Sequence, residues 1–186
     1  MYRACALKCY LSGVSVDDEK NVEKLINDTK VTVGYENGVQ VTYLDGKNVS
    51  TDIRKPEISM LASGVAKLPC VRIKMVDEQR NIAKSTSCVL DGRDIGTNVL
   101  PHAEYKFFLS AKPEIRAKRR EEENKAKGFT QPFEEILAEI IKRDEQDKNR
   151  AFAPLLKADD AVEIDSSNMS IEEVVNFILN KIQEKI

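Results

Sequence analysis

A stretch that could bind an anion follows a short apolar run near the middle of the chain. Residues 88–90, Cys-Val-Leu, read as the end of a buried strand, and the next seven residues are DGRDIGT. The guanidinium of Arg93 can donate two parallel hydrogen bonds to a phosphate, and the carboxylate of Asp94 can accept from an amine or hydroxyl. Ligands of parallel α/β sheets bind beyond the carboxyl ends of the strands. We therefore expect this loop to face a ligand-binding crevice.

A helix expected over residues 132–150 changes from an apolar to a charged face along its length. At helical spacing its first half presents Phe133, Ile136, Leu137 and Ile140. At the same i+3 and i+4 spacing, this face of the helix continues with Arg143, Asp147 and Arg150. One interpretation is an i,i+4 ion pair worth a few tenths of a kcal/mol. The other, which the pattern favours, is a pocket wall whose arginines bind an anion and whose Asp147 orients them or accepts from a hydroxyl.

A second group of arginines lies in the segment 112–128, at Arg116, Arg119 and Arg120. Three glutamates at 121–123 balance their charge, so a solvated helix face is the ordinary interpretation. The alternative is a mobile lid that brings guanidinium groups over a phosphate. Arginine suits that task because its planar fork matches phosphate oxygens bidentately.

The elements that must position these residues alternate between strands and helices. We expect strands at 86–90, 104–109 and 161–165, and helices at 113–127, 132–150 and 170–185, the last opened by a Ser170–Glu173 capping box. This alternation predicts an α/β fold, a parallel sheet with helices on both faces.

The first half of the chain has a different pattern. Helices are expected at 2–12, ended by Gly13, at 17–27 and at 70–83. Between them, two alternating runs flank Asn37-Gly38, a strong signal for a two-residue hairpin turn. The hairpin and the segment up to Pro69 are predicted to form a small mixed insertion.

Composition excludes several classes of function. Apolar residues make up 41% and charged residues 32%, which indicates a globular chain. The net charge of −2 gives no general attraction to nucleic acid or an anionic membrane. Cys5 and Cys9 lie one helical turn apart and could meet a metal, but they are expected to be two small residues on a helix face. His102 is expected to be a surface or loop residue. Without a signal peptide or membrane span, a cytoplasmic location is expected.

The assembled motifs resemble the bacterial (d)CMP kinase, or cytidylate kinase, family. The resemblance rests on MYRA, DIRKPEISMLASGVAKLPCVR, LDGRDIGTNVLP, KFFLSAKPEIRAKRR, EIIKRDEQDKNRAFAPLLKADDAVEIDSS and MSIEEVV, in this order along the chain. It implies a P-loop nucleoside monophosphate kinase fold and transfer of the γ-phosphoryl group of ATP, with Mg²⁺, to CMP or dCMP. It also implies a monomer in the full-length form, with small nucleotides as partners.

The resemblance assigns roles to individual residues. Contacts with the 5′-phosphate of the acceptor are implied for Arg3, Arg93 and Arg150, and recognition of cytosine for Ser63, Arg72 and Asp94. Ribose contacts are implied for Arg143 and Asp147, and a lid over the donor phosphates for Arg116, Arg119 and Arg120. Arg93, Arg150 and the three lid arginines are the expected catalytic residues.

The same resemblance suggests a division of the chain into five parts. These are core helices (1–28), a strand-rich insertion that binds the nucleoside monophosphate (29–69), a core segment with the DGRDIGT loop (70–111), a lid (112–131) and the C-terminal core (132–186).

The chain departs from the family at one point. Members of this family carry G-x-x-x-x-G-K-[ST] before MYRA, and the sequence contains no such motif. The expectation is that the first strands and the metal-binding hydroxyl are absent, which would leave strand 86–90 without neighbours and the isolated chain poorly folded and inactive. Two hypotheses follow: a (d)CMP kinase whose sequence starts too late or is a fragment, or a non-catalytic, CMP-binding or merely structural remnant that cannot use ATP. A different monophosphate kinase is disfavoured, because the insertion and the base-reading residues match the cytidylate type.

Overall fold

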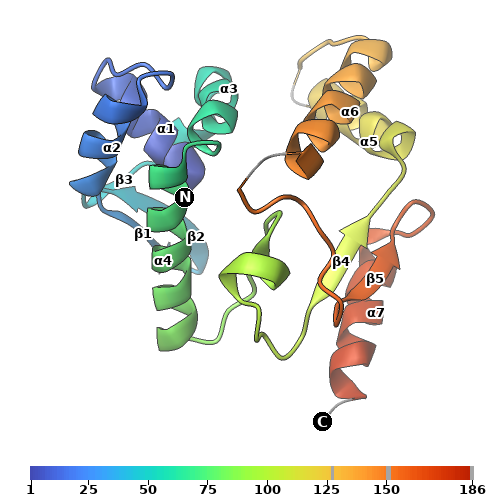
Figure 1. The fold of residues 1–186 in the computed structure, drawn as a ribbon. Coiled ribbons are helices and arrows are strands. Elements are labelled where there is room, and N and C mark those ends of the chain that lie inside the picture. Colours follow the sequence, from blue (N-terminus) through green and yellow to red (C-terminus); the bar gives the residue numbers. More distant parts are fainter. Residues whose placement is uncertain (127, 150–151, 185–186) are drawn as a thin grey trace. The chain divides into compact units, whose positions relative to one another are not determined.

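The computed structural model describes residues 1–126, 128–149 and 152–184, and the chain divides into two compact units, Met1–Val89 and Leu90–Ile186. Each unit is drawn in Figure 1. The described residues combine helices with a small parallel sheet and a separate antiparallel sheet, so the predicted mixed α/β fold class is confirmed. No helix among them is long and apolar enough to cross a membrane.

The first unit contains four helices and the antiparallel sheet. The helices are α1 (Tyr2–Leu11), α2 (Glu19–Asn27), α3 (Pro56–Val65) and α4 (Pro69–Ser85), with a 3₁₀ turn, η1 (Asp52–Arg54), before α3. Asp18 caps α2 by accepting a hydrogen bond from the backbone N–H of Asn21 at 3.2 Å. Gly13, with φ of +67°, follows α1, as predicted. The first turns of α3 and α4 contain Pro56 and Pro69, where the missing N–H costs nothing.

The predicted hairpin is confirmed. Strands β1 (Val31–Glu36) and β2 (Val39–Leu44) are antiparallel, with Glu36 opposite Val39, and the two-residue strand β3 (Lys47–Asn48) pairs with β2. Asn37 and Gly38 both have positive φ, +52° and +77°. This combination matches the right-handed twist of the flanking strands, and Asn-Gly adopts it with little strain.

The core of the first unit joins its helices to the sheet. Its fully buried side chains include Cys5, Cys9, Ile26, Ile58 and Met75. Both cysteines are free thiols, and burial raises the pKa of Cys5 to about 12, so this thiol stays protonated. Both cysteines lie on α1, where a helix was predicted.

The second unit carries the parallel sheet. Strands β4 (Phe107–Ser110) and β5 (Val162–Asp165) pair in parallel, Phe107 opposite Val162 and Ser110 opposite Asp165. The helices are α5 (Pro113–Ala126), α6 (Phe133–Asn149) and α7 (Ile171–Gln183), and α5 lies beside α6 in Figure 1. The predicted capping box at Ser170 and Glu173 is confirmed, and it sets the first turn of α7.

One predicted strand is wrong. Residues 86–91 adopt no regular secondary structure, and the side chain of Val89 is 99% exposed. An apolar run becomes a strand only when a neighbouring strand accepts and donates its ladder hydrogen bonds. Among the described residues no strand pairs with this segment. For the same reason β4 begins at Phe107 and not at residue 104, because its pairing with β5 begins there.

Candidate functional site

An arginine at the start of α5 is held by three hydrogen bonds within the second unit. The Nε of Arg116 donates to the backbone carbonyl of Ala111 at 2.9 Å. Its Nη1 and Nη2 donate to the two carboxylate oxygens of Asp144 at 2.9 and 2.5 Å. Asp144 lies on α6, which packs against α5, so the bond joins the two helices. This parallel, two-point geometry is the strongest arrangement that an arginine and a carboxylate can form.

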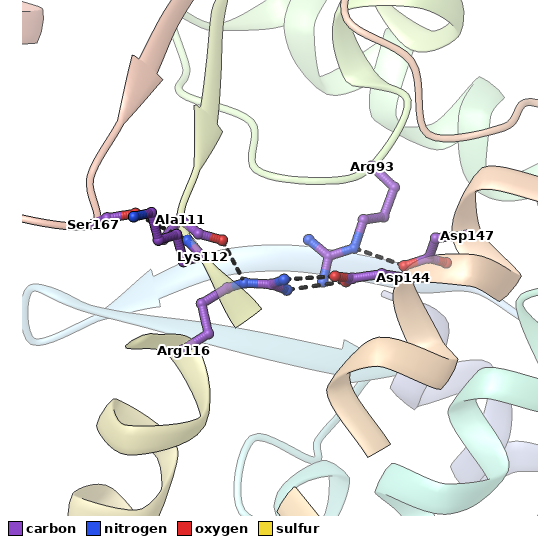
Figure 2. A network of polar contacts seen from close by, with 7 residues as sticks. All are labelled: Arg93, Ala111, Lys112, Arg116, Asp144, Asp147 and Ser167. Carbon is purple, nitrogen blue, oxygen red and sulfur yellow. Dashed lines mark hydrogen bonds and ion pairs between the residues drawn. The ribbon is translucent and has the colours of Figure 1, made fainter. Parts of the chain in front are cut away.

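A second arginine reaches α6 from the loop predicted to bind a ligand. The Nε of Arg93 donates to a carboxylate oxygen of Asp147 at 3.0 Å. Asp144 and Asp147 are three residues apart and therefore on one face of the helix. Figure 2 shows the two arginines approaching this face from different segments of the chain. The four side chains form a network of alternating charge, which we call the arginine–aspartate network.

The electrostatics of Asp144 follow from this network. The hydrogen bonds from Arg116 hold the pKa of the Asp144 carboxyl below its ordinary value, against the opposing effect of partial burial. The charges of Arg116, Lys148 and Arg93 act in the same direction as the hydrogen bonds. Reciprocally, Asp144 raises the pKa of Arg116. Both groups are therefore charged throughout the neutral range.

The lowered pKa of Asp144 predicts a pH-dependent contribution to stability. A carboxyl whose pKa is lower in the folded than in the unfolded chain stabilises the fold above its unfolded pKa, about 3.9. That stabilisation is lost as the pH falls through the folded value. We expect wild type to have a higher thermal midpoint than Asp144→Asn at neutral pH, with the difference shrinking below about pH 4. A difference that stays constant into that acidic range would show that the charge of Asp144 contributes nothing.

Asp144 was missed by the sequence interpretation. The predicted stripe on this helix ran from Ile140 to Arg143, but Arg143 is exposed, whereas Asp144 and Asp147 are partly buried. The face therefore continues through Asp144, four residues after Ile140. The sequence could have indicated Asp144, because residues at i+3 and at i+4 from Ile140 both lie on the same face of a helix. The ribose contact of Arg143 stays a prediction.

The loop that carries Arg93 and Asp94 contains one turn of π-helix, η2 (Ile95–Val99). Asp94 precedes this turn and is only 7% exposed. Its backbone carbonyl accepts from the N–H groups of Asn98 and Val99, and its carboxylate accepts from the side-chain amide of Asn98 at 2.9 Å. These hydrogen bonds join Asp94 to the η2 turn of its own loop.

The buried residue Lys106 donates a hydrogen bond to the segment that follows the same loop. Lys106 is 8% exposed, and its ammonium group donates to the carbonyl of Pro101 and to both carboxylate oxygens of Asp160, at 2.9 and 2.7 Å. Its aliphatic stem passes close to Gly96, where a Cβ would lie 3.4 Å from the lysine Cδ. A Cβ at this distance would be in ordinary van der Waals contact, so the lysine stem does not by itself require glycine at position 96.

Removal of this ammonium group is expected to destabilise the second unit. Lys106→Met keeps the stem but leaves the Pro101 carbonyl without its charged donor, at a cost of about 1–3 kcal/mol. Urea unfolding of the variant, compared with Lys112→Met at an exposed position, measures this loss. Equal midpoints for the two variants would mean that the Lys106 contacts carry no net stability.

Arg119 and Arg120, the other two arginines predicted for the lid, contact groups outside the arginine–aspartate network. Arg119 donates through Nη2 to the carbonyls of Ser166 and Met169 at 2.6 and 3.2 Å, in the turn between β5 and α7. Arg120 is exposed and pairs with Glu123 on its own helix at 3.4 Å. Of the three arginines on α5, the structure brings Arg116 alone to the carboxylates of α6. The lid function of all three stays a prediction.

Three further predicted site residues belong to the first unit. Arg3 and Ser63 are exposed, and Arg3 donates to the carbonyl of Ile53 at 3.4 Å. Arg72, on α4, is only 2% exposed. Its guanidinium carbon lies 5.7 Å from the centre of the Tyr2 ring, and its Nη1 donates to the Ala66 carbonyl at 3.3 Å. The distance of 5.7 Å is within the range of a cation–π contact between Arg72 and Tyr2.

Arg150 lies outside the described residues. Within residues 1–126, 128–149 and 152–184, no group of three or more His, Cys, Asp and Glu side chains could hold a metal ion. His102 is exposed in a turn, as predicted.

Comparisons with known proteins give a consistent result. A family model described as cytidylate kinase matches residues 1–184. The chain is 46% identical over 179 residues to a cytidylate kinase of Caldicellulosiruptor bescii, covering 96% of this chain and 79% of that protein. It is also similar to the cytidylate kinases of Clostridioides difficile, at 46% over 182 residues (98% and 82%), and Thermosipho melanesiensis, at 47% over 185 residues (100% and 82%).

Proposed function

The chain belongs to the cytidylate kinase family, and from that premise we propose that it transfers the γ-phosphoryl group of ATP to CMP or dCMP, giving CDP or dCDP. The observation that carries the proposal is the arginine–aspartate network, in which two arginines from separate segments meet one face of α6. Phosphoryl transfer needs little covalent help from the protein. It needs positioned charge and hydrogen-bond donors, a role that we assign to the guanidinium groups of Arg93 and Arg116.

The network supports a specific division of roles in phosphate binding. We assign Arg93, together with Arg3 and Arg150, to the 5′-phosphate of the acceptor, and Arg116, with Arg119 and Arg120, to the phosphates of the donor. Arg93 and Arg116 each keep further N–H capacity beyond the bonds described above, because a guanidinium carries five donors. Phosphate oxygens can therefore be bound without first breaking the contacts to α6.

Recognition of the nucleoside is assigned to residues of matching chemistry. Cytosine presents a ring nitrogen and a carbonyl as acceptors and an exocyclic amine as a donor. Arg72 and Ser63 can donate to the acceptors, and the Asp94 carboxylate can accept from the amine. Asp147 and Arg143 are assigned to the ribose. A carboxylate that accepts from the 3′-hydroxyl does not require a 2′-hydroxyl, so both CMP and dCMP fit this assignment.

The donor is proposed to be ATP with Mg²⁺, as is general for phosphotransferases of this kind. When bound, such an ion would neutralise negative charge on the donor phosphates. Magnesium in such sites is usually held by phosphate oxygens, waters and one or two carboxylates, so most of its ligands would come from ATP and water. No protein ligand is assigned.

The test is steady-state product formation by the full-length protein with ATP and Mg²⁺ and four acceptors, CMP, dCMP, UMP and AMP. The expected result is CDP and dCDP formation at the highest kcat/KM. AMP as the preferred acceptor would contradict the assignment of the base site. Binding of CMP without any CDP formation would favour the alternative hypothesis of a non-catalytic, CMP-binding protein.

A further inference from the structure

Arg116 is bound in a way that fixes the whole plane of its guanidinium group. The Nε is tied to the carbonyl of Ala111, just beyond the end of β4, and both terminal nitrogens are tied to Asp144 on α6. Because all three guanidinium nitrogens of Arg116 are hydrogen-bonded, the plane of the group has one orientation relative to the end of β4 and to α6. The Asp144 side chain is 28% exposed and that of Arg116 34% exposed. The pair is thus partly shielded from water but open to a ligand.

Asp144 also feels the charge of the second arginine of the network. The positive charge of Arg93 is among the causes that lower the pKa of Asp144. Figure 2 shows the Arg93 guanidinium beside the Asp144 carboxylate, while its own hydrogen bond runs to Asp147. Asp144 therefore lies between the arginine assigned to the acceptor phosphate and the one assigned to the donor phosphates.

We infer that Asp144 is a positioning residue, which sets the orientation of the Arg116 guanidinium for the phosphoryl group in transfer. This inference rests on the proposed function. A free arginine side chain has many rotamers, and restricting them as the transition state forms costs conformational entropy. Because Asp144 and Ala111 already hold Arg116, that cost does not fall on the transition state. Preorganised charge of this kind lowers the barrier to the chemical step and leaves substrate binding little changed.

The alternative is an ion pair that only joins α5 to α6. Such a pair would affect the unfolding midpoint but not the chemistry of the folded enzyme. The two roles are separated by measuring kcat and KM on folded protein and by observing Arg116 directly. The side-chain Nε–H resonance of an arginine is visible by NMR when the group is held, and it needs no substrate.

The experiment compares Asp144→Asn, Asp144→Glu and Glu145→Gln in the full-length protein. Glu145 is the exposed neighbour on the same helix and is the matched control. For Asp144→Asn we expect kcat for CDP formation to fall about 10- to 100-fold, with KM for ATP and CMP changed less than about threefold. The Arg116 Nε–H resonance is expected to broaden or shift. Asp144→Glu keeps the charge and is expected to recover part of kcat.

The results that would overturn the inference can be told apart. If wild type turns over CMP and Asp144→Asn does so equally well, or if the Arg116 resonance is unchanged, Asp144 has no positioning role and only the inference fails. If wild type itself forms no CDP from ATP and CMP, the proposed function fails, and the catalytic role of Asp144 fails with it. A lower unfolding midpoint with unchanged kcat assigns the pair to helix packing alone.

Discussion

Replacing Arg116 with methionine is expected to lower kcat for CDP formation by about 10²- to 10³-fold, the usual effect of removing one preorganised donor from a transition state. Methionine keeps most of the side-chain length and removes the charge. The loss should appear mainly in kcat, because the negative charge that Arg116 is proposed to neutralise develops on the transferring group. Initial rates with saturating ATP and CMP measure it.

The control for this variant lies two residues further along the same helix. Lys118 is exposed on α5, and Lys118→Met removes one positive charge from the same segment. We expect its kcat to stay within about twofold of wild type, as for a surface charge screened by water. If Arg116→Met raised only KM, Arg116 would contribute to ground-state binding and its assignment to the transferring phosphoryl group would be wrong.

Asp94→Asn is expected to lower kcat/KM for CMP by about 10²-fold while leaving KM for ATP nearly unchanged. In wild type one oxygen of the Asp94 carboxylate accepts from the amide of Asn98. In the variant the amide oxygen can keep that bond, which turns the new NH₂ group toward the ligand. A donor then faces the exocyclic amine of cytosine, which is also a donor.

The same substitution makes a prediction about selectivity. Uracil has a carbonyl in place of the amine, so the new NH₂ group of the Asp94→Asn variant can donate to it, and the ratio of CMP to UMP use should fall. Asp91→Asn, at an exposed position three residues earlier, is the control and should leave this ratio unchanged. Equal losses with CMP and ATP in Asp94→Asn would contradict the assignment of Asp94 to the base.

Elements fixed by local chemistry were predictable from the sequence. The turn at Asn37-Gly38 needs two residues with positive φ, and the caps at Asp18 and Ser170 need side-chain oxygens, so a few adjacent residues determine each. The parallel pairing of β4 with β5 followed from the alternation of strands and helices. The strand expected at 86–90 failed, because strand formation depends on a partner elsewhere, which the residues of the segment do not encode.

The sequence indicated which residues belong to the candidate site, but it did not indicate which of them form hydrogen bonds with one another. The arginines at 116, 119 and 120 share one face by spacing, and the sequence therefore grouped them. The structure separates their long side chains among Asp144, the carbonyl of Ser166 and Glu123. Similarly, the link between Arg93 and Asp147 joins residues 54 positions apart, which only the tertiary fold can bring together. The domain boundaries and the nucleotide contacts remain predictions.

The most direct test of the central claim, that this chain holds a cytidine monophosphate through its arginines, is a calorimetric titration of the full-length protein with CMP and with cytidine. We predict that wild type binds one CMP, that cytidine binds at least about tenfold more weakly, and that Arg93→Met removes most of this difference, because Arg93 is assigned to the 5′-phosphate. Equal affinity for CMP and cytidine, or a CMP affinity unchanged in Arg93→Met, would contradict the claim.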